Sequence, residues 1–299
     1  MTIPEQGYGT EELIELLKLE KIEKNLYRGN SRDLGYGHLF GGQVVSQGLS
    51  AAAATVTGDL RAHSIHCNFM QAGDTRKPIV YNVQRLYDGT SFANRQVTAL
   101  QTGVPIVCLC ASFHRAEPGF DHHPPMPEVP LPECLEDETI AYKNFLGPRP
   151  PKPLHGLFTE KPIEFRMATP VHPLSPEPAA PERHFWFKAR TPLPDNAAIH
   201  QAVLAFATDF YLASTSLRPY GKTFWSPDMM VASLDHSIWF HREFRMDDWL
   251  LHAVKSPNAS NGRGISFGRV YTRNGNLVAS VAQESLIRRM AVTPDMLHP

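Results

Sequence analysis

The amino-acid sequence predicts an α+β fold made of two tandem copies of one unit, in which a long helix is wrapped by an antiparallel sheet. Two stretches of small and apolar residues have the composition of buried helices, and a series of strand-like runs follows each stretch. The spacing also repeats, because a His-Ser pair precedes a turn glycine by 40 residues in the first half (63 to 103) and by 39 in the second (236 to 275). We therefore expect units at 1–117 and 182–299, a linker at 118–181, and sheets paired edge to edge.

In the first unit, the long helix is expected from Val44 to Val56, after a Phe-Gly-Gly-Gln turn at 40–43. Its many glycines and alanines are typical of a helix buried under a sheet. Strand-like runs follow at 61–70, 79–87, 91–101 and 104–115, and Asp88-Gly89 and Thr102-Gly103 have the composition of hairpin turns. A short amphipathic helix capped by Thr10 is expected before them, at 11–19.

The linker is defined by proline, because 16 of the chain's 26 prolines lie between 118 and 181. Such a segment cannot stay regular for long and should wrap the surface, with strand-like islands at 163–166 and 184–190 near its end. The second unit then repeats the plan. We expect a helix over 197–216 capped by Asp195, and strands at 229–240, 250–255, 264–272 and 277–288.

Composition excludes several functional classes. The chain of 299 residues has a net charge of −1, which predicts no broad attraction to nucleic acid, and it has no apolar run long enough to insert into a membrane. The N-terminus lacks a basic region followed by an apolar one, and Cys108 and Cys110 read as reduced core residues, so we expect a cytoplasmic protein. The histidine pairs have poor metal-binding spacing, so we expect no metal site.

Four separated motifs resemble the type II acyl-CoA thioesterase family, whose members have a tandem double hotdog fold. In chain order they are Phe40-Gly41-Gly42-Gln43-Val44-Val45, Asp88-Gly89-Thr90-Ser91-Phe92, Leu234-Asp235-His236-Ser237-Ile238-Trp239-Phe240-His241 and Ala279-Ser280-Val281-Ala282-Gln283-Glu284. The resemblance runs from about residue 19 to 289. It implies hydrolysis of fatty acyl-CoA to free fatty acid and CoA without a cofactor, by a chain that assembles into a homodimer or homotetramer.

The same resemblance implies the catalytic residues. In the family, a water molecule attacks the thioester and is oriented by an Asp on the second helix, a Ser or Thr before the Asp-His-Ser strand, and a Gln on the last strand. Carried over by motif, these are Asp209, Ser233 and Gln283. From the residues alone, each has an ordinary interpretation too: a hydrogen-bonded Asp at a helix bend, a strand-end serine, and a buried structural amide. Strand alternation places Ser233 with Asp235 and opposite His236.

The internal repeat offers a test of that assignment. Matching the two halves sets Ala51, Leu60 and Ala111 against the three polar residues, so all three polar groups are absent from the first unit. This asymmetry predicts one active site per chain. Gly41 and Gly42 are either a tight turn or donors of backbone N–H groups to the thioester oxygen at a helix N-terminus. Phe206, Phe210, Tyr211 and Trp239 are candidates for an acyl tunnel, with core packing as the alternative.

Two other functions stay open. One is hydration or dehydration of an enoyl-CoA thioester by the same fold, although no acid or imidazole base is evident for the substrate's α-carbon. The other is a non-catalytic acyl-CoA-binding protein, which would bind without turnover. No Gly-x-Ser-x-Gly motif is present, so a serine hydrolase of that type is unsupported.

Overall fold

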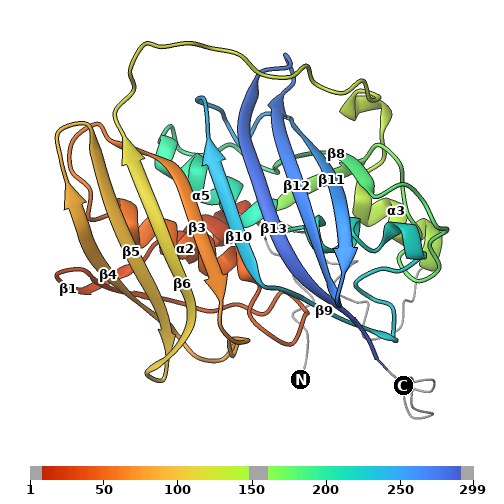
Figure 1. Cartoon of the computed structure of the whole chain (residues 1–299), viewed down its shortest axis with the longest axis horizontal. Coiled ribbons are helices and arrows are strands. Elements are labelled where there is room, and N and C mark those ends of the chain that lie inside the picture. The colour runs from red at the N-terminus through yellow and green to blue at the C-terminus, as the bar shows by residue number, and fades with distance from the viewer. Residues whose placement is uncertain (1–8, 148–160, 291–299) are drawn as a thin grey trace.

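An antiparallel sheet of 13 strands carries the two longest helices on one of its faces (Figure 1). The computed structural model describes residues 9–147 and 161–290. The first half of the sheet is, in spatial order, β1 (Glu20–Glu23), β2 (Leu26–Gly29), β4 (Ile79–Asp88), β5 (Phe92–Gln101), β6 (Val104–His114) and β3 (Arg61–Phe69). The second half is β10 (Asp235–Phe240), β13 (Leu277–Arg289), β12 (Arg263–Thr272), β11 (Leu250–Ser260), β8 (Glu182–Ala189) and β7 (Ile163–Met167). The remaining strand, β9 (Met229–Ser233), pairs with the end of β13.

The two units meet edge to edge, as the repeat predicts. β3 pairs antiparallel with β10, and Ile65 lies directly opposite Ile238 at this junction. Both isoleucines are buried, because one face of each strand turns toward the helices. The pairing removes an open edge from each unit and makes one continuous sheet.

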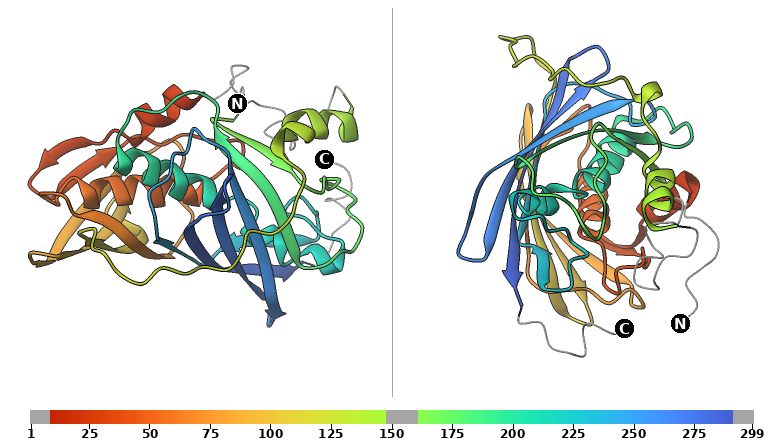
Figure 2. Two further views of the ribbon diagram at one scale, coloured as in Figure 1. Left: turned by 90° about the horizontal axis from the view of Figure 1, so that it is seen from above. Right: turned by 90° about the vertical axis from the view of Figure 1, so that its right-hand side faces the viewer.

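The helices of the described residues all lie on one face of this sheet, the inner face (Figure 2). α2 (Gly41–Ala53) and α5 (Ala197–Thr208) pack against each other, one from each unit. The two backbones approach closely where α2 has a glycine, because a Cβ on Gly42 would lie 2.5 Å from the Phe206 carbonyl oxygen of α5. The shorter helices are α1 (Thr10–Leu17), α3 (Glu138–Leu146) and α6 (Leu212–Thr215), with 3₁₀ turns at Pro132–Cys134 and Arg218–Tyr220.

Helix boundaries differ from the expectations at three places. α2 begins at Gly41, so its two glycines form its first turn and do not precede it. α5 is capped by Asn196, whose side chain accepts from the Ala198 N–H, and not by Asp195. Thr10 does not cap α1 either, because its hydroxyl donates to the Pro162 carbonyl at 3.1 Å.

The helix expected over 197–216 is interrupted at residues 209–211. α5 ends at Thr208, Asp209 follows as its C-cap, and Tyr211 adopts a left-handed conformation with φ of 69° before α6 starts. A non-glycine residue in that region is uncommon and costs energy, so surrounding contacts must hold it.

The strand expected at 229–240 is also interrupted. Ser233 of β9 faces Ser285, whereas Ser237 of β10 faces Ala282, so the register against β13 shifts by one residue near Leu234. A β-bulge of this kind reverses the alternation of side chains. The expectation that Ser233 points away from His236 is therefore wrong.

The segment expected as a linker contains regular structure that its proline content did not predict. This structure is α3, which is capped by Asp137. The strand-like islands expected at 163–166 and 184–190 are confirmed as β7 and β8, which pair with each other. Residues 148–160 of the segment lie outside the described part of the chain. The core assignment of the cysteines also needs correction, because Cys110 is exposed and Cys108 half-buried. Among the described residues, no helix is long and apolar enough to cross a membrane.

Candidate active site

A cavity of about 490 Å³ opens where the start of α2, the break after α5 and strand β9 come together. Asp209 and Ser233 both line it, and so does Gly41 from the other unit. Most of the remaining wall is apolar and aromatic, with Phe40, Val44, Phe69, Phe210, Tyr211, Phe224, Trp225 and Leu234 among its residues. A mostly apolar cavity with a few converging polar groups is the usual form of a small-molecule site.

The Asp209 carboxylate is held against the N-terminus of α2. Its Oδ2 accepts from the Gly42 N–H at 2.7 Å, and its side chain is buried, with 9% of the residue exposed. Phe40, at the N-cap position of α2, gives no side-chain cap, so Asp209 satisfies this amide from the other unit. A carboxylate is unfavourable at the C-terminus of its own helix, and the positive end of α2 offsets that cost.

The two glycines are required by the closeness of this contact. A Cβ on Gly41 would lie 2.7 Å from Asp209 Oδ2 and 2.9 Å from the Phe69 ring, and one on Gly42 would lie 2.5 Å from the Phe206 carbonyl oxygen. The Gly42 N–H already donates to Asp209, whereas Gly41 lines the cavity.

Ser233 connects the carboxylate to a buried chain of hydrogen bonds. Its hydroxyl donates to Asp209 Oδ1 at 3.4 Å and accepts from Gln283 Nε2 at 2.6 Å. Gln283 is only 1% exposed and also lies 2.8 Å, through Oε1, from His236 Nδ1. The structure therefore brings all three predicted residues together, with Gln283 behind Ser233 and not on the cavity wall.

Two residues of this chain were not singled out from the sequence as site residues, His236 and Thr208. His236 is fully buried and lies 3.2 Å, through Nε2, from the Thr208 hydroxyl. Burial lowers the pKa of His236, although Asp209 and the Gln283 hydrogen bond act in the opposite direction. The lowered pKa favours a neutral ring. A neutral ring with the proton on Nδ1 donates to Gln283 and accepts from Thr208, which fixes the orientation of the amide. In the sequence, the feature that could have indicated His236 is an imidazole on a strand face that is otherwise apolar.

The other sequence candidates divide between the cavity and the core. Phe210 and Tyr211 line the cavity. Phe206 is instead fully buried and packs against Phe40, with ring centroids 5.2 Å apart, while Trp239 lies half-exposed beside His66. Ala51, Leu60 and Ala111, the counterparts of the polar residues in the first unit, do not line the cavity.

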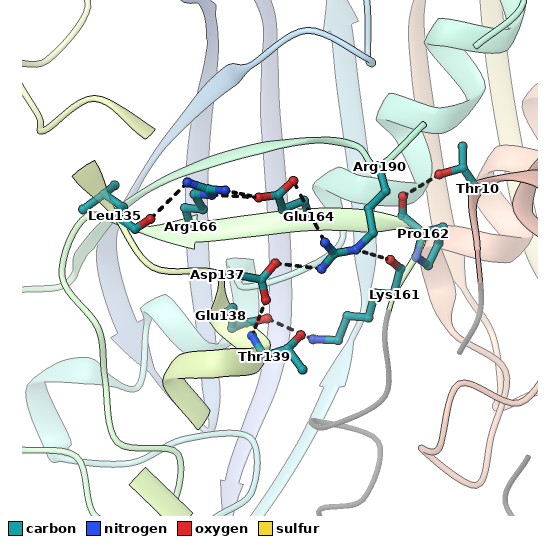
Figure 3. Close-up of polar contacts among 10 residues, drawn as sticks. All are labelled: Thr10, Leu135, Asp137, Glu138, Thr139, Lys161, Pro162, Glu164, Arg166 and Arg190. Carbon is teal, nitrogen blue, oxygen red and sulfur yellow. Dashed lines mark hydrogen bonds and ion pairs between the residues drawn. The ribbon is translucent and has the colours of Figure 1, made fainter. Parts of the chain in front are cut away.

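A charged cluster from α3 and the adjoining segment forms another part of the cavity wall. Lys161 Nζ lies 2.9 Å from Glu138 Oε2, as Figure 3 shows, and the hydroxyls of Tyr142 and Tyr211 donate to Glu138 Oε1. Burial by itself lowers the pKa of Lys161, but the Glu138 carboxylate raises it above its ordinary value, so the amine is charged. Lys161, Tyr142, Tyr211 and Arg183 all line the cavity.

Among the described residues, no group of three or more His, Cys, Asp or Glu side chains is arranged to hold a metal ion.

Comparison with known proteins gives the family of this chain. Two family profiles match, one described as acyl-CoA thioesterase over residues 156–286 and one as acyl-CoA thioesterase N-terminal domain over 31–114. The chain is 41% identical over 277 residues to acyl-CoA thioesterase 2 of Haemophilus influenzae, covering 92% of this chain and 96% of that one. It is 38% identical over 283 residues to human acyl-coenzyme A thioesterase 8, covering 91% and 88%.

Solved structures give the same result. The acyl-CoA thioesterase II TesB2 of Mycobacterium marinum superimposes with a TM-score of 0.75 at 35% identity, covering 93% of this chain and 99% of that one. A hot dog fold protein of Alicyclobacillus acidocaldarius gives a TM-score of 0.74 at 17% identity, covering 93% and 98%, which shows the fold alone. The predicted double hotdog fold is confirmed, and the chain belongs to the acyl-CoA thioesterase family.

Proposed function

We propose that this chain hydrolyses acyl-CoA thioesters to a fatty acid and CoA in the cavity that contains Asp209 and Ser233. The observation that carries the proposal is the Asp209 carboxylate, which is almost fully buried in a largely apolar cavity and held by the Gly42 N–H at 2.7 Å. A carboxylate fixed in this way can orient and deprotonate a water molecule beside a bound thioester. Family membership supports the same reaction.

In the proposed reaction, Asp209 accepts a proton from water as the water oxygen attacks the thioester carbonyl carbon. The negative charge that develops on the carbonyl oxygen faces the N-terminal end of α2, where the Gly41 N–H is the proposed donor. Collapse of the tetrahedral intermediate breaks the C–S bond, and Asp209 returns the proton to the departing sulfur. The products are a carboxylic acid and the CoA thiol.

The remaining residues have supporting roles in this proposal. Ser233 contacts Asp209 and lines the cavity, so it can hold the same water. Gln283 acts as a positioning residue that orders the Ser233 hydroxyl through its 2.6 Å hydrogen bond. Gly42 positions Asp209, and we assign it no substrate contact.

The test is release of free thiol from a chain-length series of saturated acyl-CoAs. Asp209→Asn should lower kcat by about 10²- to 10⁴-fold, because the amide keeps an acceptor for Gly42 but cannot take a proton. The matched control is Asp235→Asn: Asp235 also accepts a backbone N–H, from Glu284 at 2.7 Å, but does not line the cavity. This control should keep its kcat.

Two outcomes would overturn the proposal. Binding of acyl-CoA without any thiol release would indicate a non-catalytic binding protein, and turnover of an enoyl-CoA without thiol release would indicate a hydratase. The homodimer or homotetramer expected from the sequence stays a prediction, which light scattering of the purified chain can check. The cytoplasmic location and the division into units at 1–117 and 182–299 also stay predictions.

A further inference from the structure

Arg183 of β8 is a buried cation with an unsatisfied donor on the wall of the cavity. The residue is 8% exposed, its Nε is sealed from solvent, and that atom has no hydrogen-bond partner in the described part of the chain. Another buried arginine of this chain shows the usual arrangement. Arg95, 1% exposed, donates to the Thr55 hydroxyl, to three backbone carbonyls and to the Asp88 carboxylate. Since a buried guanidinium is normally satisfied in this way, Arg183 needs an explanation.

The surroundings of Arg183 leave its charge uncompensated. Its guanidinium carbon lies 5.3 Å from the centre of the Tyr211 ring, an attractive but weak contact. The buried carboxylate of Glu138, which also contacts the Tyr211 hydroxyl, is paired with Lys161 at 2.9 Å. Within the described residues, no carboxylate forms an ion pair with Arg183.

The positive charge of Arg183 also affects a neighbouring cation, Arg218. Burial lowers the pKa of Arg218, and the positive charge of Arg183 lowers it further, against the influence of Glu182. Lys161 and Arg183 both line the cavity, but Lys161 is already paired with Glu138, and Asp209 lies on the wall formed by α2 and β9.

We propose that Arg183 is an anion-binding residue of this cavity and that it pairs with an anionic oxygen group of the acyl-CoA substrate. The inference rests on the proposed function and names a further contact for the same substrate. Two anionic groups have this chemistry: a phosphate of CoA, or a carboxylate at the far end of the acyl chain. A planar guanidinium suits both, because its parallel N–H groups bind two oxygens at once.

The experiment uses Arg183→Met and three thioesters with the acyl length that the wild type hydrolyses fastest. They are the saturated acyl-CoA, the matching acyl pantetheine, which lacks phosphate, and the matching ω-carboxyacyl-CoA. If the anion is a phosphate, KM for both CoA esters should rise about 10- to 100-fold, with acyl pantetheine unchanged. If the anion is a carboxylate, only the ω-carboxyacyl-CoA should lose kcat/KM to that extent. The matched control, Arg269→Met, removes an exposed arginine of β12 that does not line the cavity and should change none of the three.

The proposal is overturned if Arg183→Met leaves kcat/KM unchanged for all three substrates, or lowers it equally for all three together with the melting temperature. Should Arg183→Met fail to fold, Arg183→Lys decides the question, because it keeps a cation but loses the planar pair of donors. Arg183→Lys should then impair the same substrates as predicted for Arg183→Met, but to a smaller extent. Wild-type kcat/KM for all three substrates overturns the proposal.

Calorimetric binding of a non-hydrolysable S-alkyl-CoA and its ω-carboxy analogue separates this inference from the proposed function. Absence of thiol release from the wild type would refute the proposed hydrolysis. Weaker binding of either ligand by the Arg183 variants, with wild-type binding by Arg269→Met, would still support the anion site.

Discussion

Gln283→Ala should destabilise the fold and also slow the reaction, and the two effects can be separated. The Gln283 side chain makes hydrogen bonds with Ser233 at 2.6 Å, with His236 at 2.8 Å and with Ser285 at 3.3 Å. His236 and Ser285 are both buried, so truncation leaves two groups without a partner and out of reach of water. At about 1–3 kcal/mol for each orphaned group, the free energy of unfolding should fall by about 2–6 kcal/mol.

The kinetic effect has a different cause. Without the amide, the Ser233 hydroxyl loses the donor that fixes it beside Asp209, and a displacement of about 1 Å at such a group can cost about 100-fold in rate. Urea unfolding gives the stability, measured above the ordinary pKa of histidine so that His236 stays neutral in both states. Thiol release at low temperature, where the variant stays folded, gives kcat.

The matched control is Gln47→Ala. Gln47 is fully buried in α2 and makes three hydrogen bonds of similar length: to the carbonyls of Leu16 (2.6 Å) and Asn30 (3.0 Å), and from the Tyr81 hydroxyl (2.6 Å). It should lose comparable stability while kcat is retained, because it does not touch Ser233. The reasoning is refuted if Gln283→Ala has a kcat no lower than that of Gln47→Ala.

Two further predictions concern the α2 contact and acid stability. Gly41→Ala should lower kcat by about tenfold or more, because its Cβ would lie 2.7 Å from Asp209 Oδ2. In the control variant Gly48→Ala, the new Cβ meets nothing closer than 3.5 Å, so this change should keep kcat and stabilise α2 by about 1 kcal/mol. Equal kcat in the two variants would contradict the prediction for Gly41. Burial lowers the pKa of His252 to about 3, and neither ring nitrogen has a hydrogen-bond partner within residues 9–147 and 161–290. Because the unfolded chain binds this proton and the folded chain does not, stability should be full above about pH 6.5 and fall by about 1.4 kcal/mol per pH unit as the pH drops toward 3. Urea unfolding at several pH values should show this slope, and His252→Leu should reduce it; an unchanged slope would count against His252.

Elements with a strong local pattern could be predicted from the sequence. The strands at 61–69, 79–88, 92–101 and 104–114 lie within about a residue of their expected ends, because alternating apolar residues and turn glycines mark them. α3 could not be predicted in the same way. Its proline-rich surroundings favour irregular structure, and it forms with an Asp137 cap and a buried Glu138 that contacts Lys161 and Tyr211.

The active-site geometry depended on two local irregularities that no periodic pattern predicts. α5 ends at Thr208, shortly before the left-handed Tyr211, and the Asp209 side chain reaches the first turn of α2, which is distant in the sequence. β9 and β10 are offset by the bulge near Leu234, which turns Ser233 toward the same amide as His236. Sequence alternation alone therefore assigned Ser233 to the wrong face.

By itself, the sequence determined the α+β class, the tandem repeat, the edge-to-edge pairing and, through the motif resemblance, the candidates Asp209, Ser233 and Gln283. Only the tertiary structure decided that Asp209 is held by an amide of the other unit, that Gln283 lies behind Ser233 against the buried His236, and that Arg183 Nε is buried without a hydrogen-bond partner among the described residues. The physical reason is the range of the interactions involved. Periodicity and turn chemistry act between neighbours in the chain, whereas burial and the hydrogen bonds of these groups depend on residues as far as 167 positions away.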